Sequence, residues 1–228
     1  MTVLHLADEG EAADLAAFLS RLLRYDRAAA VRLQAAGTAL AVFGRPPSFE
    51  VLAVRAVRLA KPYEDGLDVT LDVTVSAGEL LEAVDEKAAT AGVPGAVTGP
   101  PWAGLLPPRG GWRPEPGLPA PDALRALVAA AVAEFRSRTG ELAPEGRTRA
   151  ELDRIGREIW SRTVGDTGLP VRAVHAAQSL GFLGPPGAPS GEDAPKLLSS
   201  GTWLRLRTPY GSVALRRAGA GALGISVR

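Results

Sequence analysis

The chain of 228 residues is 46% hydrophobic and 22% charged, a composition that is typical of a folded globular protein and excludes wholesale disorder. It contains no cysteine, which excludes disulfides, a thiolate nucleophile and Cys-ligated zinc. Residues 1–100 carry 9 Arg or Lys and 14 Asp or Glu (net −5), whereas residues 101–228 carry 17 and 11 (net +6). This uneven charge indicates different partners for the two parts, or chance combined with mutual docking.

The amino-terminal residues and the choice of basic residues indicate location and source. Acidic residues stand where a secretory signal would need a basic segment, and no apolar run approaches the ~20 residues of a membrane span. We expect a cytoplasmic protein that makes no membrane contact. Arginine replaces lysine almost everywhere and Ala, Gly and Pro are abundant, which resembles a protein from a GC-rich genome such as that of an actinobacterium. A single arginine therefore carries little functional weight.

Residues 1–93 are predicted to form an acidic α+β domain with a sandwich-like arrangement. Apolar and polar residues alternate on both sides of a turn at Gly37, which is a hairpin pattern, and a further turn is expected over 61–66. Ser76 and Glu79 form a capping box that starts a helix. The expected elements are a strand over 3–6, a helix over 9–25, strands over 30–44, 49–60 and 67–75, and a helix over 78–88.

The order of these elements resembles one repeat of a DNA sliding clamp. The resemblance rests on the leucine-rich helix over 9–25, on the segments VRLQAAGTALAVFG and FEVLAVRAVRLA, and on DVTVSAGELLEAV. Helices of a clamp repeat face DNA with basic residues, so the resemblance implies DNA contact by Arg21, Arg24 and Arg27. The alternative is an independent α/β sandwich that serves as an oligomerisation or regulatory module.

Residues 94–121 are predicted to form a connector, because their many prolines and glycines prevent a helix or a central strand. Trp102, Leu105, Leu106 and Trp112 are too apolar for a free tether. We expect an extended, partly docked segment whose tryptophans cover apolar surface. A ligand for a proline-recognising module is the alternative interpretation.

Residues 122–228 are predicted to form a basic domain of three helices followed by a β-hairpin. The first helix opens at Pro121, where a missing backbone donor does no harm. Thr148 and Glu151 form a capping box for the second helix, and Gly181 closes the third. The helices are expected over residues 121–140, 148–164 and 170–180, and a loop is expected over 184–201.

The third helix and the hairpin resemble the DNA-binding surface of a winged helix-turn-helix protein. The run TGLPVRAVHAAQSLGFLG resembles the third helix of winged-helix transcription factors, which implies double-stranded DNA as the partner. Spacings of three and four place polar side chains on one face of this helix, and Arg and Gln can pair with base edges in the major groove. Arginines of the hairpin GTWLRLRTPYGSVALRR would follow the phosphate backbone as a wing does. The expected DNA-binding residues are Arg172, His175, Gln178 and Ser179 of the helix, and Arg205, Arg207, Arg216 and Arg217 of the hairpin.

Two alternatives stay open for this surface. The helix face is also compatible with simple solvation, and the hairpin with an edge ribbon that its charges keep from aggregating.

No motif of a known enzyme class is present, and no cofactor or metal site is expected. The sequence lacks a G-x-S-x-G elbow, an H-E-x-x-H pair and a Walker loop, and His5 lies on an expected strand. The hypothesis is a non-enzymatic cytoplasmic protein that binds DNA or associates with it. The alternative is a protein-interaction or regulatory scaffold with a protein partner, or one that self-associates through the amino-terminal domain. A hydrolase built from dispersed carboxylates also stays open.

Overall fold

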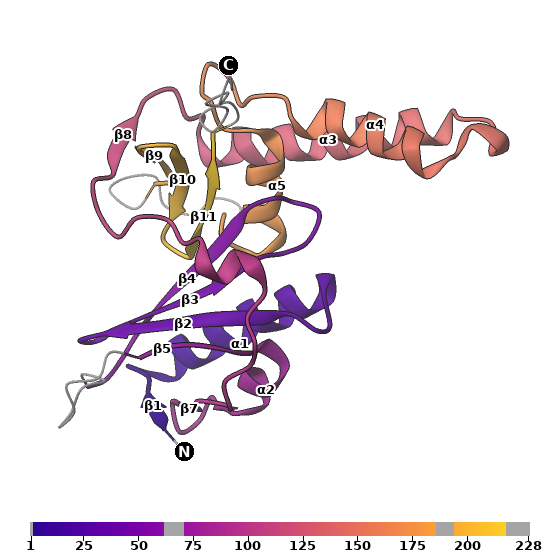
Figure 1. The fold of residues 1–228 in the computed structure, drawn as a ribbon. Coiled ribbons are helices and arrows are strands. Elements are labelled where there is room, and N and C mark those ends of the chain that lie inside the picture. The colour runs from indigo at the N-terminus through magenta and orange to yellow at the C-terminus, as the bar shows by residue number, and fades with distance from the viewer. Residues whose placement is uncertain (1, 62–70, 186–193, 218–228) are drawn as a thin grey trace, which may run out of the picture.

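The computed structural model describes residues 2–61, 71–185 and 194–217, which form an α+β protein around one long antiparallel sheet (Figure 1). Residues 62–66 of the expected turn and residues 186–193 of the expected loop lie outside the described residues. Among the described residues, an eight-stranded sheet has the order β5-β2-β3-β4-β11-β10-β9-β8, and a small sheet has the order β1-β7-β6.

The described elements have the following bounds. The strands are β1 (Val3–His5), β2 (Ala30–Ala36), β3 (Ala39–Gly44), β4 (Leu52–Arg58), β5 (Asp72–Ser76), β6 (Val84–Asp85), β7 (Thr90–Gly92), β8 (Arg113–Glu115), β9 (Lys196–Ser200), β10 (Trp203–Thr208) and β11 (Gly211–Arg216). The helices are α1 (Glu9–Tyr25), α2 (Ala77–Glu82), α3 (Pro121–Gly140), α4 (Arg149–Trp160) and α5 (Val171–Ser179), with short 3₁₀ turns η1 (Pro101–Gly104) and η2 (Pro144–Gly146).

Local sequence patterns account for most of these elements. The expected helix over 9–25 is confirmed as α1, and the hairpin about Gly37 is confirmed as β2 and β3, with Gly37 at φ +55°. The Ser76 hydroxyl accepts a hydrogen bond from the backbone N–H of Glu79 (3.4 Å) and so starts α2. This helix ends at Glu82, earlier than expected, because the chain turns there into β6 and β7.

The long sheet separates two faces of different character. Helices α1 and α5 pack on one side, here called the helix face, over the main apolar core. The connector crosses the other side, here called the connector face, where Trp102 and Leu106 pack on Phe43, Leu52 and Val54. The expected docking of the connector is therefore observed for Trp102. Within the connector, η1 and the edge strand β8 interrupt an otherwise irregular path.

The sheet runs without interruption across the predicted boundary between the two halves of the chain. Strand β11 pairs with β4, with Ser212 opposite Val54 and Ala214 opposite Leu52. Arg55 of β4, which is 7% exposed, ties the halves together: it donates to Asp14 of α1 and to the carbonyl of Tyr210, both at 2.7 Å. The two halves of the chain thus share one sheet and one core.

The structure does not confirm the predicted winged-helix unit. Both strands of the predicted wing have outer neighbours, since β11 pairs with β4 and β10 pairs with β9. The five residues Lys196–Ser200 form β9, so the expectation of a loop over this segment is wrong. The hairpin is consequently an internal part of the sheet, neither a free wing nor an edge ribbon.

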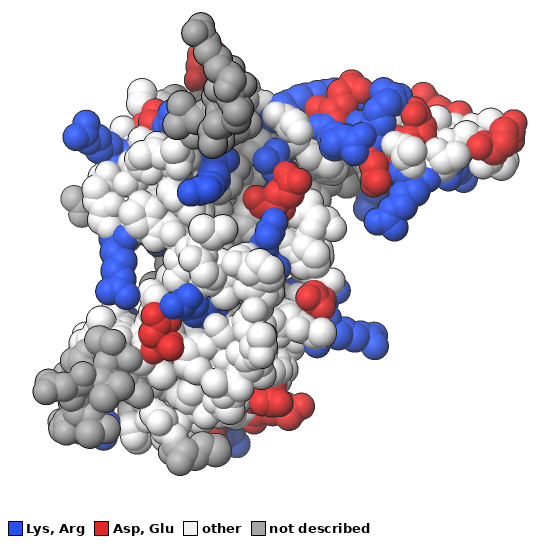
Figure 2. All heavy atoms as spheres, in the orientation of Figure 1, with Lys and Arg blue, Asp and Glu red and all other residues white. Residues whose placement is uncertain are grey.

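Helices α3 and α4 form an antiparallel arm that projects from the end of the sheet (Figure 1). The side-chain oxygen of Thr148 accepts a hydrogen bond from the N–H of Glu151 (3.2 Å), which confirms the second capping box. The charged residues of the arm largely pair with one another: Glu134 contacts Arg138 and Arg162, and Glu158 contacts Arg138. In Figure 2 the two colours alternate along the arm, which agrees with internal pairing.

Candidate functional site

The predicted recognition face of α5 packs against other parts of the protein. The His175 ring stacks on Trp160 at the end of α4 (ring centroids 4.7 Å apart) and meets Phe49 of the β3–β4 loop edge-on (5.2 Å). Arg172 forms an ion pair with Glu50 of the same loop (3.4 Å). Burial lowers the pKa of His175 below its ordinary value, so the neutral ring is favoured. These contacts leave neither side chain free to enter a DNA groove.

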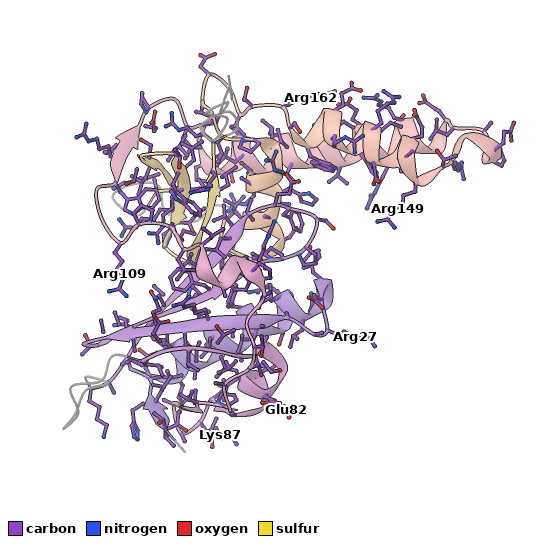
Figure 3. All side chains as sticks on the ribbon, viewed as in Figure 1. Arg27, Glu82, Lys87, Arg109, Arg149 and Arg162 are labelled. Carbon is purple, nitrogen blue, oxygen red and sulfur yellow. The ribbon has the colours of Figure 1, made fainter. Side chains whose placement is uncertain are left out.

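The other two predicted residues of α5 lie further along the helix. Gln178 is exposed and Ser179 is half-buried next to the carboxyl end of the helix. Arg21 of α1 donates to the carbonyl of Leu180 (3.4 Å), so this arginine links α1 to the end of α5. Arg24 of α1 and Arg27, in the turn that follows this helix, are exposed, and Arg27 projects from the protein in Figure 3.

Three of the four predicted arginines of the hairpin, Arg205, Arg207 and Arg216, lie on the opposite side of the sheet from α5. Leu204 and Leu206 alternate with Arg205 and Arg207, and the leucines are buried in the core beneath α5. Side chains of successive strand residues point to opposite faces, so the arginines point to the connector face. The sheet itself therefore separates the two groups of residues that were predicted to share one DNA-binding surface.

Four basic residues gather on the connector face and form what we call the basic strip. Arg207 of β10 stands directly opposite Lys196 of β9 in the antiparallel ladder, an arrangement that is destabilising for like charges. No residue of the strip has an ion pair with an acidic side chain among the described residues. Burial lowers the pKa of Arg205, and the charge of Arg207 lowers it further. The basic strip consists of Lys196, Arg205, Arg207 and Arg216.

Two tryptophans accompany the basic strip. The guanidinium carbon of Arg205 lies 5.6 Å from the ring centroid of Trp112, and that of Arg216 lies 5.7 Å from the ring centroid of Trp203. Both rings are half-buried and therefore present part of their surface to solvent. Arg217 stands apart, because it pairs with Glu115 beyond the end of β11. Basic side chains beside aromatic rings on a sheet face are a combination suited to an extended anionic chain.

Sequence reasoning found Arg205, Arg207 and Arg216 but missed Lys196. Lys196 and Leu198 alternate with the buried Leu197, and this short strand pattern was hidden behind the Pro- and Gly-rich segment that precedes it. The register of β9 against β10 decides that Lys196 faces Arg207, and no local pattern specifies that register.

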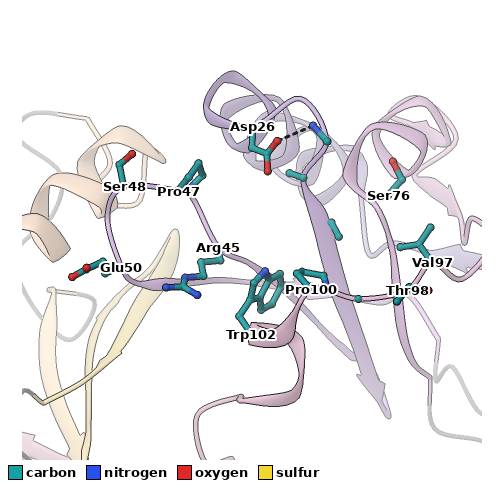
Figure 4. Close-up of a pocket in the computed structure, with 14 residues that line it drawn as sticks. Asp26, Arg45, Pro47, Ser48, Glu50, Ser76, Val97, Thr98, Pro100 and Trp102 are labelled. Carbon is teal, nitrogen blue, oxygen red and sulfur yellow. Dashed lines mark hydrogen bonds between the residues drawn. The ribbon is translucent and has the colours of Figure 1, made fainter. Parts of the chain in front are cut away.

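A groove of about 720 Å³ lies between the β3–β4 loop and residues 97–102 of the connector (Figure 4). Two of its polar groups already serve the backbone, because Asp26 accepts a hydrogen bond from the N–H of Ala28 (2.9 Å) and Ser76 caps α2. Arg45 is exposed and, within the described part of the chain, forms no ion pair. Its lining combines the carboxylates of Asp26 and Glu50 with Arg45, and Glu50 already pairs with Arg172.

The described residues contain no cluster of three or more His, Asp or Glu side chains suited to a metal ion. Within the same part of the chain, none of the helices combines the length and apolar character needed to cross a bilayer.

The fold and the basic strip describe an α+β protein with a basic, tryptophan-bearing sheet face. Residues 1–104 match the family described as "Domain of unknown function (DUF8010)", and residues 107–220 match the one described as "Domain of unknown function (DUF8185)". The second match spans half of the chain, and the chain belongs to the DUF8185 family. No curated protein sequence matches it.

Proposed function

We propose that this protein is a non-enzymatic nucleic-acid-binding protein whose basic strip contacts the phosphates of a single strand. The observation that carries the proposal is the juxtaposition of Lys196 and Arg207 on neighbouring strands, with no acidic partner for either among the described residues. Like charges in this position are destabilising by themselves, and an anionic chain would relieve their repulsion.

The architecture of the sheet favours a single strand over a duplex. A two-stranded ribbon or an exposed helix can enter the major groove, but the β10–β11 hairpin is flanked by β4 and β9, and α5 is packed on the core. A sheet face with aromatic rings can instead stack bases that are not paired, while nearby cations contact the backbone. Trp203 and Trp112 would supply the stacking surfaces and the basic strip the phosphate contacts.

The experiment is a fluorescence anisotropy titration of a labelled oligothymidine over a series of salt concentrations. Four phosphate contacts on a single strand predict a slope of log K against log salt of about −3. The double variant Lys196→Gln/Arg207→Gln should weaken binding and reduce the slope to about −1.5. Arg149→Gln is the matched control, because Arg149 is 95% exposed on the arm and far from the strip in sequence and fold (Figure 3).

Two outcomes would contradict the proposal. One is absence of binding to oligothymidine at low ionic strength, which would leave the protein-interaction alternative. The other is an unchanged salt slope in the double variant, which would place binding elsewhere. A duplex of the same length serves as the comparison, and tighter binding of the duplex would overturn the preference for a single strand.

A further inference from the structure

A second groove, of about 290 Å³, opens on the connector face beside the basic strip. Its floor is formed by strands β2, β3 and β4, and Pro107 and Pro108 of the connector form a wall above them. The volume lies just below the ~300–1,000 Å³ that is usual for ligand pockets. The groove therefore suits a small molecule.

The groove is hollow because the strands carry small side chains at this place. Ala36, Ala39, Ala41 and Ala56 all belong to the lining, where larger residues would have filled the space below the connector. Phe43 and Val54, which also line the groove, pack against Trp102 and Leu106. A small apolar floor holds water poorly, so an apolar group would replace that water favourably.

The charges around the groove are not balanced. Its one carboxylate, Asp72, already accepts two hydrogen bonds from Arg32 (2.7 and 2.9 Å) and one from Gln34 (3.1 Å). Arg205 and Arg109 also line the groove, and among the described residues neither forms an ion pair within 4 Å. Arg109 projects from the connector in Figure 3. Hydrogen bonding by Arg32 lowers the pKa of Asp72, and the charge of Arg109 lowers it further. The lining thus combines an apolar floor with two cations and one carboxylate that Arg32 already binds.

We propose that this groove binds a small amphipathic anion, a carboxylate or sulfonate on an apolar body. The acid group would lie between Arg109 and Arg205, and the apolar body would cover Ala41 and Ala56. Charge complementarity selects this class, because two guanidinium groups and one carboxylate, already bound by Arg32, line the groove; Arg205 also donates through Nε to the Ser212 hydroxyl (2.9 Å). The inference is independent of nucleic-acid binding, although Arg205 contributes to both surfaces.

The experiment uses the full chain and the fluorescent probe anilinonaphthalene sulfonate, displaced by octanoate or by octanol. We expect saturable probe binding, displacement by octanoate, and displacement by octanol that is about tenfold weaker, since octanol carries no negative charge to pair with the guanidinium groups. Arg109→Gln should weaken octanoate binding by about tenfold and leave octanol unchanged. Arg149→Gln is the control for loss of a surface charge.

Variants of the floor test the place of binding. Ala41→Leu and Ala56→Leu fill the groove from two different strands and should each abolish displaceable probe binding, whereas Ala133→Leu on the exposed side of α3 should not. Thermal unfolding checks the fold of both floor variants, and loss of probe binding in a variant that melts as the wild type does supports the groove as the binding site. Equal affinity for octanoate and octanol, or full probe binding in a correctly folded floor variant, would overturn the proposal.

Discussion

Neutralising Arg207 is expected to stabilise the protein while weakening its binding of anions. Arg207 stands opposite Lys196 and lowers the pKa of Arg205, so its charge is repelled by two neighbours. A like-charged pair in directly opposite strand positions costs about 0.2–1 kcal/mol. We therefore expect Arg207→Gln to raise the free energy of unfolding by about 0.5 kcal/mol and the melting temperature by about 1–2 °C.

The assay is urea denaturation together with thermal unfolding, at low salt and at about 1 M NaCl, where the Debye length is only ~3 Å. The gain in stability should shrink at high salt, because screening already weakens the repulsion in the wild type. Arg207→Lys keeps the charge and should give no gain. A loss of stability in Arg207→Gln, or a gain that persists undiminished at high salt, would refute the electrostatic reasoning.

Three further predictions concern stability. Burial lowers the pKa of His175, so the unfolded chain binds a proton at this ring more readily than the folded chain does. The wild type should therefore lose stability as pH falls from about 7 through ~6.5 towards 5. His175→Phe should flatten this pH dependence in a series of urea melts. Arg55→Ala removes a buried link between the two halves and should cost about 3 kcal/mol in the same assay, whereas the exposed Arg58→Ala should change little. Gly211→Ala should lower stability by about 2 kcal/mol, because φ is +151° and a Cβ would meet the Phe182 ring at 2.5 Å, whereas Gly104→Ala in open space should be neutral by thermal unfolding.

Several helices and hairpins could be predicted from the sequence because each depends on residues that are close together in the chain. Apolar spacing predicted α1, and the two capping boxes located the starts of α2 and α4. Alternation about Gly37 and about the TPYG turn predicted both hairpins, and for the second hairpin it also predicted the buried residues Leu204, Leu206, Val213 and Leu215. Each of these features depends on neighbours a few residues apart in the chain.

The partners of the strands could not be predicted in this way. The pairing of β11 with β4 joins segments more than 150 residues apart, and it depends on which edges are left free after both hairpins have formed. Strand β9 escaped notice because five residues after a proline-rich segment carry too few alternations to separate a strand from a loop. Consequently the hairpin that was predicted to be a wing lies between β9 and β4 in the middle of the sheet.

The sequence by itself determined that an apolar helix face and an alternating, arginine-bearing hairpin exist in the carboxyl-terminal half. Only the tertiary structure decided that they meet through their apolar sides, because burying Leu204 and Leu206 beneath α5 turns the intervening arginines to the other face of the sheet. The same burial places Arg207 beside Lys196 and the connector over a floor of alanines. The hydrophobic effect buries the leucine side of the hairpin and one side of α5 against each other, and this burial determines where the candidate sites lie.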